Sequence, residues 1–184
     1  MAKDFRFELG TTWLNLQSTM SGRLRDRTVE LLDTPQRLQE WLTAVGLGPL
    51  RKADGADLIR ARVLREAVYA IVRAAADGEP MPRPAVRTLN EFLALDRAPR
   101  ISVTADGLAA GCPKDADEAL ARIARQAADA LTGPNPVRLH TCSDELCSGV
   151  FVDDTGRRRW CSDTRCGSRA RVTAHRARVA GRRR

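Results

Sequence analysis

The sequence lacks any long apolar segment. Its 184 residues contain no run near the roughly 18 apolar residues that a membrane-spanning helix needs. Residues 1–6 carry charged side chains where a secretory signal peptide has an apolar region. We therefore predict a cytoplasmic protein with no membrane partner.

Aromatic residues are also scarce. They make up 4% of the chain, although hydrophobic residues as a whole reach 43%. The core must then consist mainly of leucine, valine, isoleucine and alanine. Alanine-rich helices are the natural elements of such a core because alanine has the highest helix propensity. The composition predicts a mostly helical fold rather than a disulfide scaffold or a disordered chain.

The common catalytic motifs are missing too. The chain contains no P-loop, no His-Glu-x-x-His, no zinc-deaminase His-x-Glu and no nucleophile elbow. We therefore predict that the protein is not an enzyme.

Positive charge is concentrated at one end of the chain. Residues 138–184 contain 12 arginines and 5 acidic residues, a net of +7, whereas the rest of the chain is close to neutral. A near-neutral body joined to a basic end indicates a module that binds a polyanion such as nucleic acid. A solvated basic tail that serves only solubility is the alternative that charge alone leaves open.

Four of the five cysteines lie within 25 residues. Cys142 and Cys147 form one C-x4-C pair, and Cys161 and Cys166 form a second pair 13 residues later. A reducing compartment disfavours disulfides, and two such pairs supply the four thiolates of a tetrahedral Zn²⁺ site. We predict one structural Zn²⁺ bound by these four residues, and we interpret Cys112 as an ordinary buried or half-exposed thiol.

The hydrophobic pattern predicts a mainly helical body in residues 1–133. Apolar residues recur at helical spacing at about 12–20, 35–45, 56–76, 84–95 and 115–131. A short strand is predicted at residues 5–9, and a small β-hairpin around residues 101–110. In the longest helix the predicted buried residues are Ile59, Val63, Leu64, Ala67, Val68, Ile71 and Val72.

Gly133-Pro134-Asn135-Pro136 indicates a linker, after which residues 137–184 form a second domain. We predict a treble-clef or ribbon-like zinc module with short strands near residues 137–140 and 150–152. Residues 1–132 should then fold without zinc. A helix should start after the second cysteine pair and run to about residue 180. One of its faces is small enough to lie against the zinc hairpin: Cys166, Ala170, Thr173 and Ala177.

The other faces of this helix carry arginines in two stripes. These are the predicted nucleic-acid contacts: Arg165, Arg169, Arg171, Arg176, Arg178 and Arg182. Arg169 lies close behind the last cysteine, so we predict that it either reads a guanine or braces the zinc loop. Phe151 and Trp160 are interpreted as a small core beneath the metal rather than as base-stacking groups.

The residues around the second cysteine pair resemble the CGNR zinc-finger family. Arg159-Trp160-Cys161-Ser162 and Cys166-Gly167-Ser168-Arg169 match the family's second loop, which normally ends Cys-Gly-Asn-Arg, and a basic helix follows. Ser168 stands where the family has Asn.

The body resembles the ABATE domain that usually precedes this zinc finger. The matching positions are Phe7, Gly10, Leu14-Asn15-Leu16-Gln17-Ser18-Thr19, Leu38, Trp41, Gly46-Leu47 and Leu89-Asn90. Asn15 and Ser18 stand where the family has Asp and Asn. The resemblance implies a bacterial, stress-induced transcription regulator with a sensor or interaction domain ahead of a DNA-binding module.

We therefore predict a transcription regulator that binds duplex DNA through a structural four-cysteine zinc finger. Its N-terminal domain would sense a small-molecule effector or a partner. The sequence leaves the oligomeric state open, with a homodimer as one option. Two alternatives share the same features. One is an RNA- or ribosome-associated zinc protein, and the other is a redox switch in which thiolate oxidation ejects the zinc.

Overall fold

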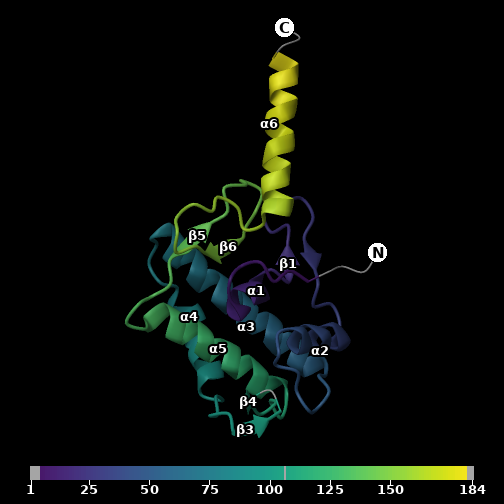
Figure 1. Cartoon of the computed structure of the whole chain (residues 1–184), viewed down its shortest axis with the longest axis vertical. Coiled ribbons are helices and arrows are strands. Elements are labelled where there is room, and N and C mark those ends of the chain that lie inside the picture. The colour runs from purple at the N-terminus through teal and green to yellow at the C-terminus, as the bar shows by residue number, and fades with distance from the viewer. Residues whose placement is uncertain (1–4, 106, 182–184) are drawn as a thin grey trace.

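The chain folds into a helical body from which one helix projects (Figure 1). This computed structural model describes residues 5–105 and 107–181. The projecting helix, α6 (Ser168–Gly181), follows a π-helical turn, η1 (Asp163–Gly167). In the described residues the body contains α1 (Thr12–Gln17), α2 (Pro35–Ala44), α3 (Gly55–Asp77), α4 (Arg83–Leu93) and α5 (Ala116–Thr132).

Side-chain caps set the ends of the body helices. Thr34 accepts a hydrogen bond from the Arg37 N–H at 3.2 Å, just ahead of the proline that opens α2. Asp54 caps α3 and forms a reciprocal capping box with Asp57. Gly78 ends α3 in the left-handed conformation, at φ +71°. These helices confirm the mainly helical class, with bounds within a few residues of the prediction.

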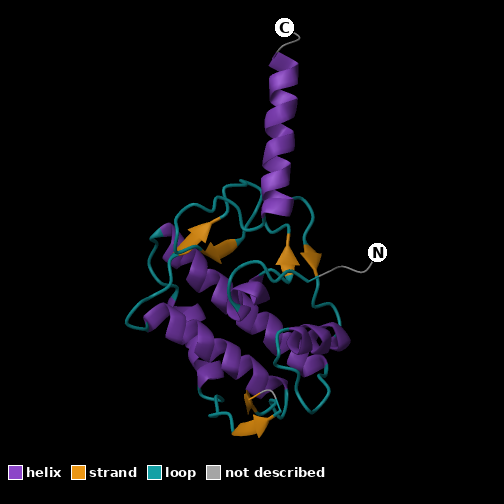
Figure 2. Ribbon diagram, in the orientation of Figure 1, coloured by secondary structure: helices purple, strands orange, loops and turns teal. Residues whose placement is uncertain are grey.

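The strands form three two-stranded antiparallel sheets in the described residues (Figure 2). They pair β1 (Met20–Ser21) with β2 (Val29–Glu30), β3 (Ile101–Thr104) with β4 (Gly107–Ala110), and β5 (Leu139–Thr141) with β6 (Val150–Val152). The predicted hairpin at residues 101–110 is confirmed as β3–β4. The predicted strand at residues 5–9 is wrong. That segment donates and accepts too few ladder bonds, although the Leu9 carbonyl accepts one from the Val152 N–H at 3.2 Å.

Helix α3 lies at the centre of the body and packs against α1, α2, α4 and α5. Its predicted buried stripe is partly wrong, because Ile59 and Val63 are 63% and 46% exposed. Leu58 and Arg65 are buried instead. The face of α3 that meets the other helices is therefore rotated towards Leu58 and Arg65. The spacing of apolar residues could not predict this rotation, because a prediction from apolar residues places every arginine at the surface.

The hydrophobic core crosses the predicted boundary at residues 133–137. Val150 and Phe151, in β6, are fully buried in the same cluster as Trp13 of α1. A buried polar contact joins the same elements, since Gln17 Nε2 donates to the Val150 carbonyl at 2.7 Å. The zinc module thus packs directly on the helical body. The domain limits, and the folding of residues 1–132 without zinc, stay predictions.

Arg65 is the largest polar side chain of the core, and it fastens the β1–β2 hairpin to α3. Its guanidinium donates to both carboxylate oxygens of Glu30, at 2.7 and 2.6 Å, and to Thr19 Oγ1 at 3.1 Å. Only 1% of the side chain is exposed. A buried charge is costly without a partner, so this pair is one of the contacts that hold the hairpin on α3, beside the Arg23–Glu66 pair at 2.6 Å.

We expect Arg65→Met to lower the free energy of unfolding by about 2 kcal/mol, because Glu30 loses two charge-assisted hydrogen bonds and is left with Arg62 Nε at 3.6 Å. Chemical denaturation measures the loss. The control is Arg73→Met on the same helix, where Arg73 pairs at the surface with Asp77. That change should cost less than about 1 kcal/mol. Equal losses in the two variants would contradict the anchoring role of Arg65.

Candidate metal centre and cationic helix

The four predicted zinc ligands come together at one place. Cys142 and Cys147 lie in the loop between β5 and β6, Cys161 lies just before η1, and Cys166 lies within it. Their Sγ atoms are all within 4.8 Å of one another. Three of the cysteines are buried and Cys147 is half-buried.

The sulfur spacing fits a tetrahedral zinc ion. The Sγ atom of Cys161 lies 3.5 Å from that of Cys147 and 3.6 Å from that of Cys166. Four sulfurs bound at about 2.3 Å from Zn²⁺ would stand about 3.8 Å apart. Donor type, number and spacing all suit Zn²⁺, and four protein ligands are the set of a structural site. The cluster is therefore a structural zinc site.

Backbone N–H groups orient the sulfurs. The Cys161 N–H points at Cys142 Sγ, and the Gly149 N–H points at Cys147 Sγ, each at 3.4 Å. A Cβ atom on Gly149 would lie 2.9 Å from Cys161 Sγ, so only glycine lets the first loop approach the second. Such outer contacts hold ligands in the orientation that the metal needs.

Crowding opposes the simultaneous ionisation of these sulfurs. Burial and the neighbouring Cys147 and Cys142 thiolates raise the pKa of the Cys166 thiol to about 12. Hydrogen bonding with Cys142 and Cys147, together with burial, raises the pKa of Cys161. A bound divalent cation reverses this preference because it deprotonates a coordinating thiol. Zinc binding and thiolate formation are thus coupled, and binding releases protons.

Arg169 contacts both zinc loops. Its Nε and Nη2 atoms donate to Asp144 Oδ2, at 3.0 and 2.5 Å, and Nη2 also lies 3.1 Å from Cys166 Sγ. Asp144 belongs to the first loop and Cys166 to the second, so Arg169 crosslinks them. These contacts suit the predicted brace, and the role of Arg169 stays a prediction.

The other predicted nucleic-acid residues lie on or just before α6. Arg165, Arg176 and Arg178 are exposed, and Arg171 is an exposed partner of Asp163 at 3.0 Å. Arg182 lies outside the described residues. Projection of α6 away from the body keeps these side chains clear of the core (Figure 1).

The expected packing of α6 against the zinc hairpin is wrong. Thr173 and Ala177, on the small-residue face, are exposed, and only Cys166 and Gly167 at the base of the helix are buried. The reason is that β5 and β6 pack against α3 of the body. Their apolar side is therefore already covered, and α6 has nothing to lie on.

Several contributors to this site were missed by sequence reasoning. Arg158 lies over the Phe151 ring at 4.5 Å, donates to the Glu8 carbonyl at 2.7 Å, and also donates to the Cys161 carbonyl. The only available signal is a run of three arginines, which indicates charge and no particular contact. His140 is not among the clustered ligands, because its Nε2 lies 3.0 Å from the Asp153 carbonyl. Cys112 is exposed rather than buried or half-buried.

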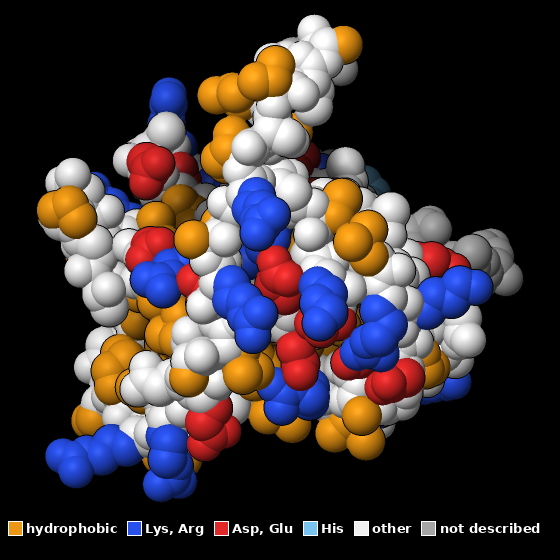
Figure 3. Space-filling model, turned by 90° about the horizontal axis from the view of Figure 1, so that it is seen from below, with side chains coloured by type: hydrophobic (Ala, Val, Ile, Leu, Met, Phe, Trp, Pro, Cys, Tyr) orange, Lys and Arg blue, Asp and Glu red, His pale blue; other side chains and the backbone are white. Residues whose placement is uncertain are grey.

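The end of the body away from α6 has a different charge distribution. Seen from below, basic and acidic side chains are interspersed there (Figure 3). This matches the near-neutral charge of the body sequence. No helix in the part of the chain that the structure describes is long and apolar enough to cross a membrane.

The fold and the site define a zinc-finger protein with a helical N-terminal domain. Comparison with family models finds the ABATE family, described as "Putative stress-induced transcription regulator", over residues 10–134. It also finds the CGNR zinc finger over residues 138–179. The chain belongs to the ABATE family and carries a CGNR zinc finger. No curated protein matches it.

We expect purified protein to contain about one zinc per chain, because the four thiolates fill one tetrahedral site. Elemental analysis checks the ratio. Cys161→Ser combined with Cys166→Ser should abolish zinc retention, whereas Cys112→Ser, at an exposed cysteine outside the cluster, should leave it unchanged. Full zinc content in the double variant would contradict the ligand assignment.

Arg169→Gln should weaken zinc retention by roughly ten-fold or more, because outer-shell partners of metal ligands have effects of that size. The measurement is the rate of zinc transfer to a chelating dye. Arg171→Gln is the matched control. Arg171 lies on the same helix, and its carboxylate partner in the structure is the exposed Asp163, at 3.0 Å. Identical rates of zinc transfer in the two variants would contradict the proposal that Arg169 braces the zinc loops.

Proposed function

We propose that this zinc-binding regulator binds duplex DNA by laying α6 in the major groove. The observation that carries the proposal is a 14-residue arginine-rich helix that leaves the body with its side chains from residue 171 to 179 exposed. At 1.5 Å per residue the helix is about 20 Å long. A major groove about 12 Å wide admits such a helix.

The stripes on α6 suggest how it would be oriented. At 100° per residue of α6, Arg169 and Arg176 share one side, and Arg171 and Arg178 form a second stripe. Arg165 lies ahead of the helix, in η1. Two separate cationic stripes suit the phosphates on the two walls of a groove. Because Arg169 is held by Asp144, phosphate binding on the first side falls to Arg176 and, ahead of the helix, to Arg165.

The strip between the stripes would face the base edges. Helical spacing places Val172, His175 and Val179 there, and the two valines are 47% and 39% exposed. Exposed valines on a soluble helix suit contact with thymine methyl groups, and the imidazole can bond to a base edge. Sequence preference would therefore come from these three residues rather than from Arg169.

A catalytic role is not part of this proposal. Four thiolates leave a tetrahedral zinc no open position for a water molecule or a substrate. We therefore propose that the zinc acts only as a structural element that fixes the base of α6.

The test is binding of the zinc-loaded full chain to duplex DNA at several salt concentrations. Four thiolates and one Zn²⁺ reduce the net charge of residues 138–184 from +7 to about +5. The slope of log affinity against log salt should therefore lie near −4 to −5. Arg176→Ala with Arg178→Ala should weaken binding to all sequences and reduce the slope by about 2.

Matched controls separate the outcomes. Arg87→Ala removes an exposed arginine of α4 and should leave the slope unchanged. Val172→Ser should alter the preferred sequence with little effect on the slope. Tighter binding to structured RNA than to duplex DNA at the same salt would favour the RNA-associated alternative. A salt-independent affinity would contradict nucleic-acid binding of either kind.

A further inference from the structure

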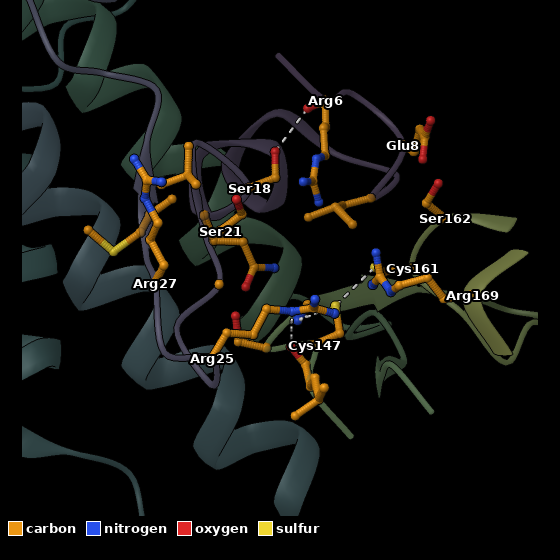
Figure 4. Close-up of a pocket in the computed structure, with 18 residues that line it drawn as sticks. Arg6, Glu8, Ser18, Ser21, Arg25, Arg27, Cys147, Cys161, Ser162 and Arg169 are labelled. Atoms are coloured by element: carbon orange, nitrogen blue, oxygen red, sulfur yellow. Dashed lines mark hydrogen bonds between the residues drawn. The ribbon is translucent and has the colours of Figure 1, made fainter. Parts of the chain in front are cut away.

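A cavity of about 250 Å³ lies where the N-terminal segment meets the zinc loops. Its walls come from residues 6–9, from α1, from the loop between β1 and β2, and from the two zinc loops (Figure 4). Arg6, Arg25 and Arg169 reach towards the same space from different sides (Figure 4). The volume is close to the lower end of the range for small-molecule sites.

Two buried polar atoms in the cavity walls have no protein partner within the described residues. One is Oε1 of Gln17, whose side chain is only 4% exposed, and the other is Nε of Arg6. The amide of Gln17 cannot turn over to hide its oxygen, because its Nε2 donates to the Val150 carbonyl at 2.7 Å. Two side chains that line the cavity thus hold one acceptor and one donor without a partner among the described residues.

The walls also carry a small excess of positive charge. Arg6, Arg25, Arg27 and Arg169 line the cavity, and they are opposed by the lining carboxylate of Glu8 and by a zinc–thiolate centre of about −2. About one positive charge is left over. Arg25 and Arg169 both approach Asp144, at 3.9 and 2.5 Å, whereas Arg6 forms no ion pair with any described residue.

The backbone around Arg6 is held in place by two polar contacts with Asn15 and Ser18. Ser18 Oγ donates to the Arg6 carbonyl at 3.0 Å, and Asn15 Oδ1 accepts from the Leu9 N–H at 3.0 Å. Both residues therefore fix the segment that carries Arg6. The backbone that carries Arg6 is therefore positioned before any ligand arrives, which lowers the entropic cost of binding.

We propose that this cavity binds a small organic monoanion that also carries a hydrogen-bond donor, such as a hydroxycarboxylate. The carboxylate pairs with Arg6, and the donor of the ligand satisfies Oε1 of Gln17. A charge-assisted bond to an arginine and a bond to a buried amide together fix the orientation of the ligand. Because the cavity wall includes Cys147, Cys161 and Arg169, the bound anion contacts the loops that set the direction of α6. Only this regulatory consequence rests on the proposed DNA binding.

The test uses 4-hydroxybenzoate and lactate as probes, with the neutral 4-hydroxybenzamide and lactamide as matched compounds that lack the charge. Each is titrated into the zinc-loaded full chain, and binding is followed by calorimetry and by NMR shifts of the arginine side chains. The acids should bind and the amides should not. Arg6→Met should weaken binding of the acids about ten-fold or more, and Arg6→Lys should restore part of it.

Arg25→Met provides a second variant in case Arg6→Met does not fold, and it should also weaken binding. Arg87→Met on α4 changes net charge equally outside the cavity and should have no effect. The proposal is overturned if neither acid binds, or if Arg6→Met and Arg25→Met bind the acids as well as Arg87→Met does.

Duplex DNA distinguishes a free ligand from a backbone phosphate. If DNA displaces 4-hydroxybenzoate and Arg6→Met weakens both by the same factor, the cavity is a subsite for DNA phosphate and the effector proposal fails. If the acids bind but duplex DNA does not, the proposed function alone fails and the cavity assignment holds.

Discussion

The convergence of four cysteine sulfurs is the constraint on which the C-terminal module depends. Its strands β5 and β6 are three residues each, and residues 153–160 between β6 and the second zinc loop contain no helix or strand. Regular hydrogen bonding therefore cannot fix the second loop relative to the first. The zinc, the Arg169–Asp144 bond and one backbone bond from the Ser143 N–H to the Arg159 carbonyl at 2.9 Å do so. Because Cys166 belongs to the turn that opens into α6, these contacts also fix the direction of that helix.

The same loops are attached to the helical body by a continuous core. Phe151 lies under the zinc loops and against the body, and the Gln17–Val150 bond places α1 beside β6. A module this small has little apolar surface of its own to bury, so the body supplies the rest. The two zinc loops therefore contribute both to the base of α6 and to the cavity beside Arg6. A structural change at one of these places can alter the others through direct contacts.

Sequence reasoning succeeded where local chemistry decides the outcome. Thr34, Asp54 and Asp115 cap helices close to the predicted starts, and the paired cysteine spacing located all four sulfurs of the cluster. It failed where the outcome depends on what a distant segment covers. Ile59 and Val63 have the spacing of core residues but face no partner, while Arg65 is buried because Glu30, 35 residues away, meets it. The expected packing of α6 on the zinc hairpin was wrong for the same reason, because α3 occupies the side of β5 and β6 that the helix was expected to cover.

Arginine is the residue whose role the sequence resolves least. Each of the 28 arginines counts equally in the net charge, yet the structure uses them in different ways. Arg65 holds a hairpin on α3, Arg158 joins the zinc module to the N-terminal segment, and Arg169 links the two zinc loops. Guanidinium groups that are bound to the protein's own carboxylates and carbonyls are poorly placed to release counterions from a polyanion. Among the described residues, the arginine charge left to contact a nucleic acid therefore resides mainly in the exposed Arg165, Arg176 and Arg178.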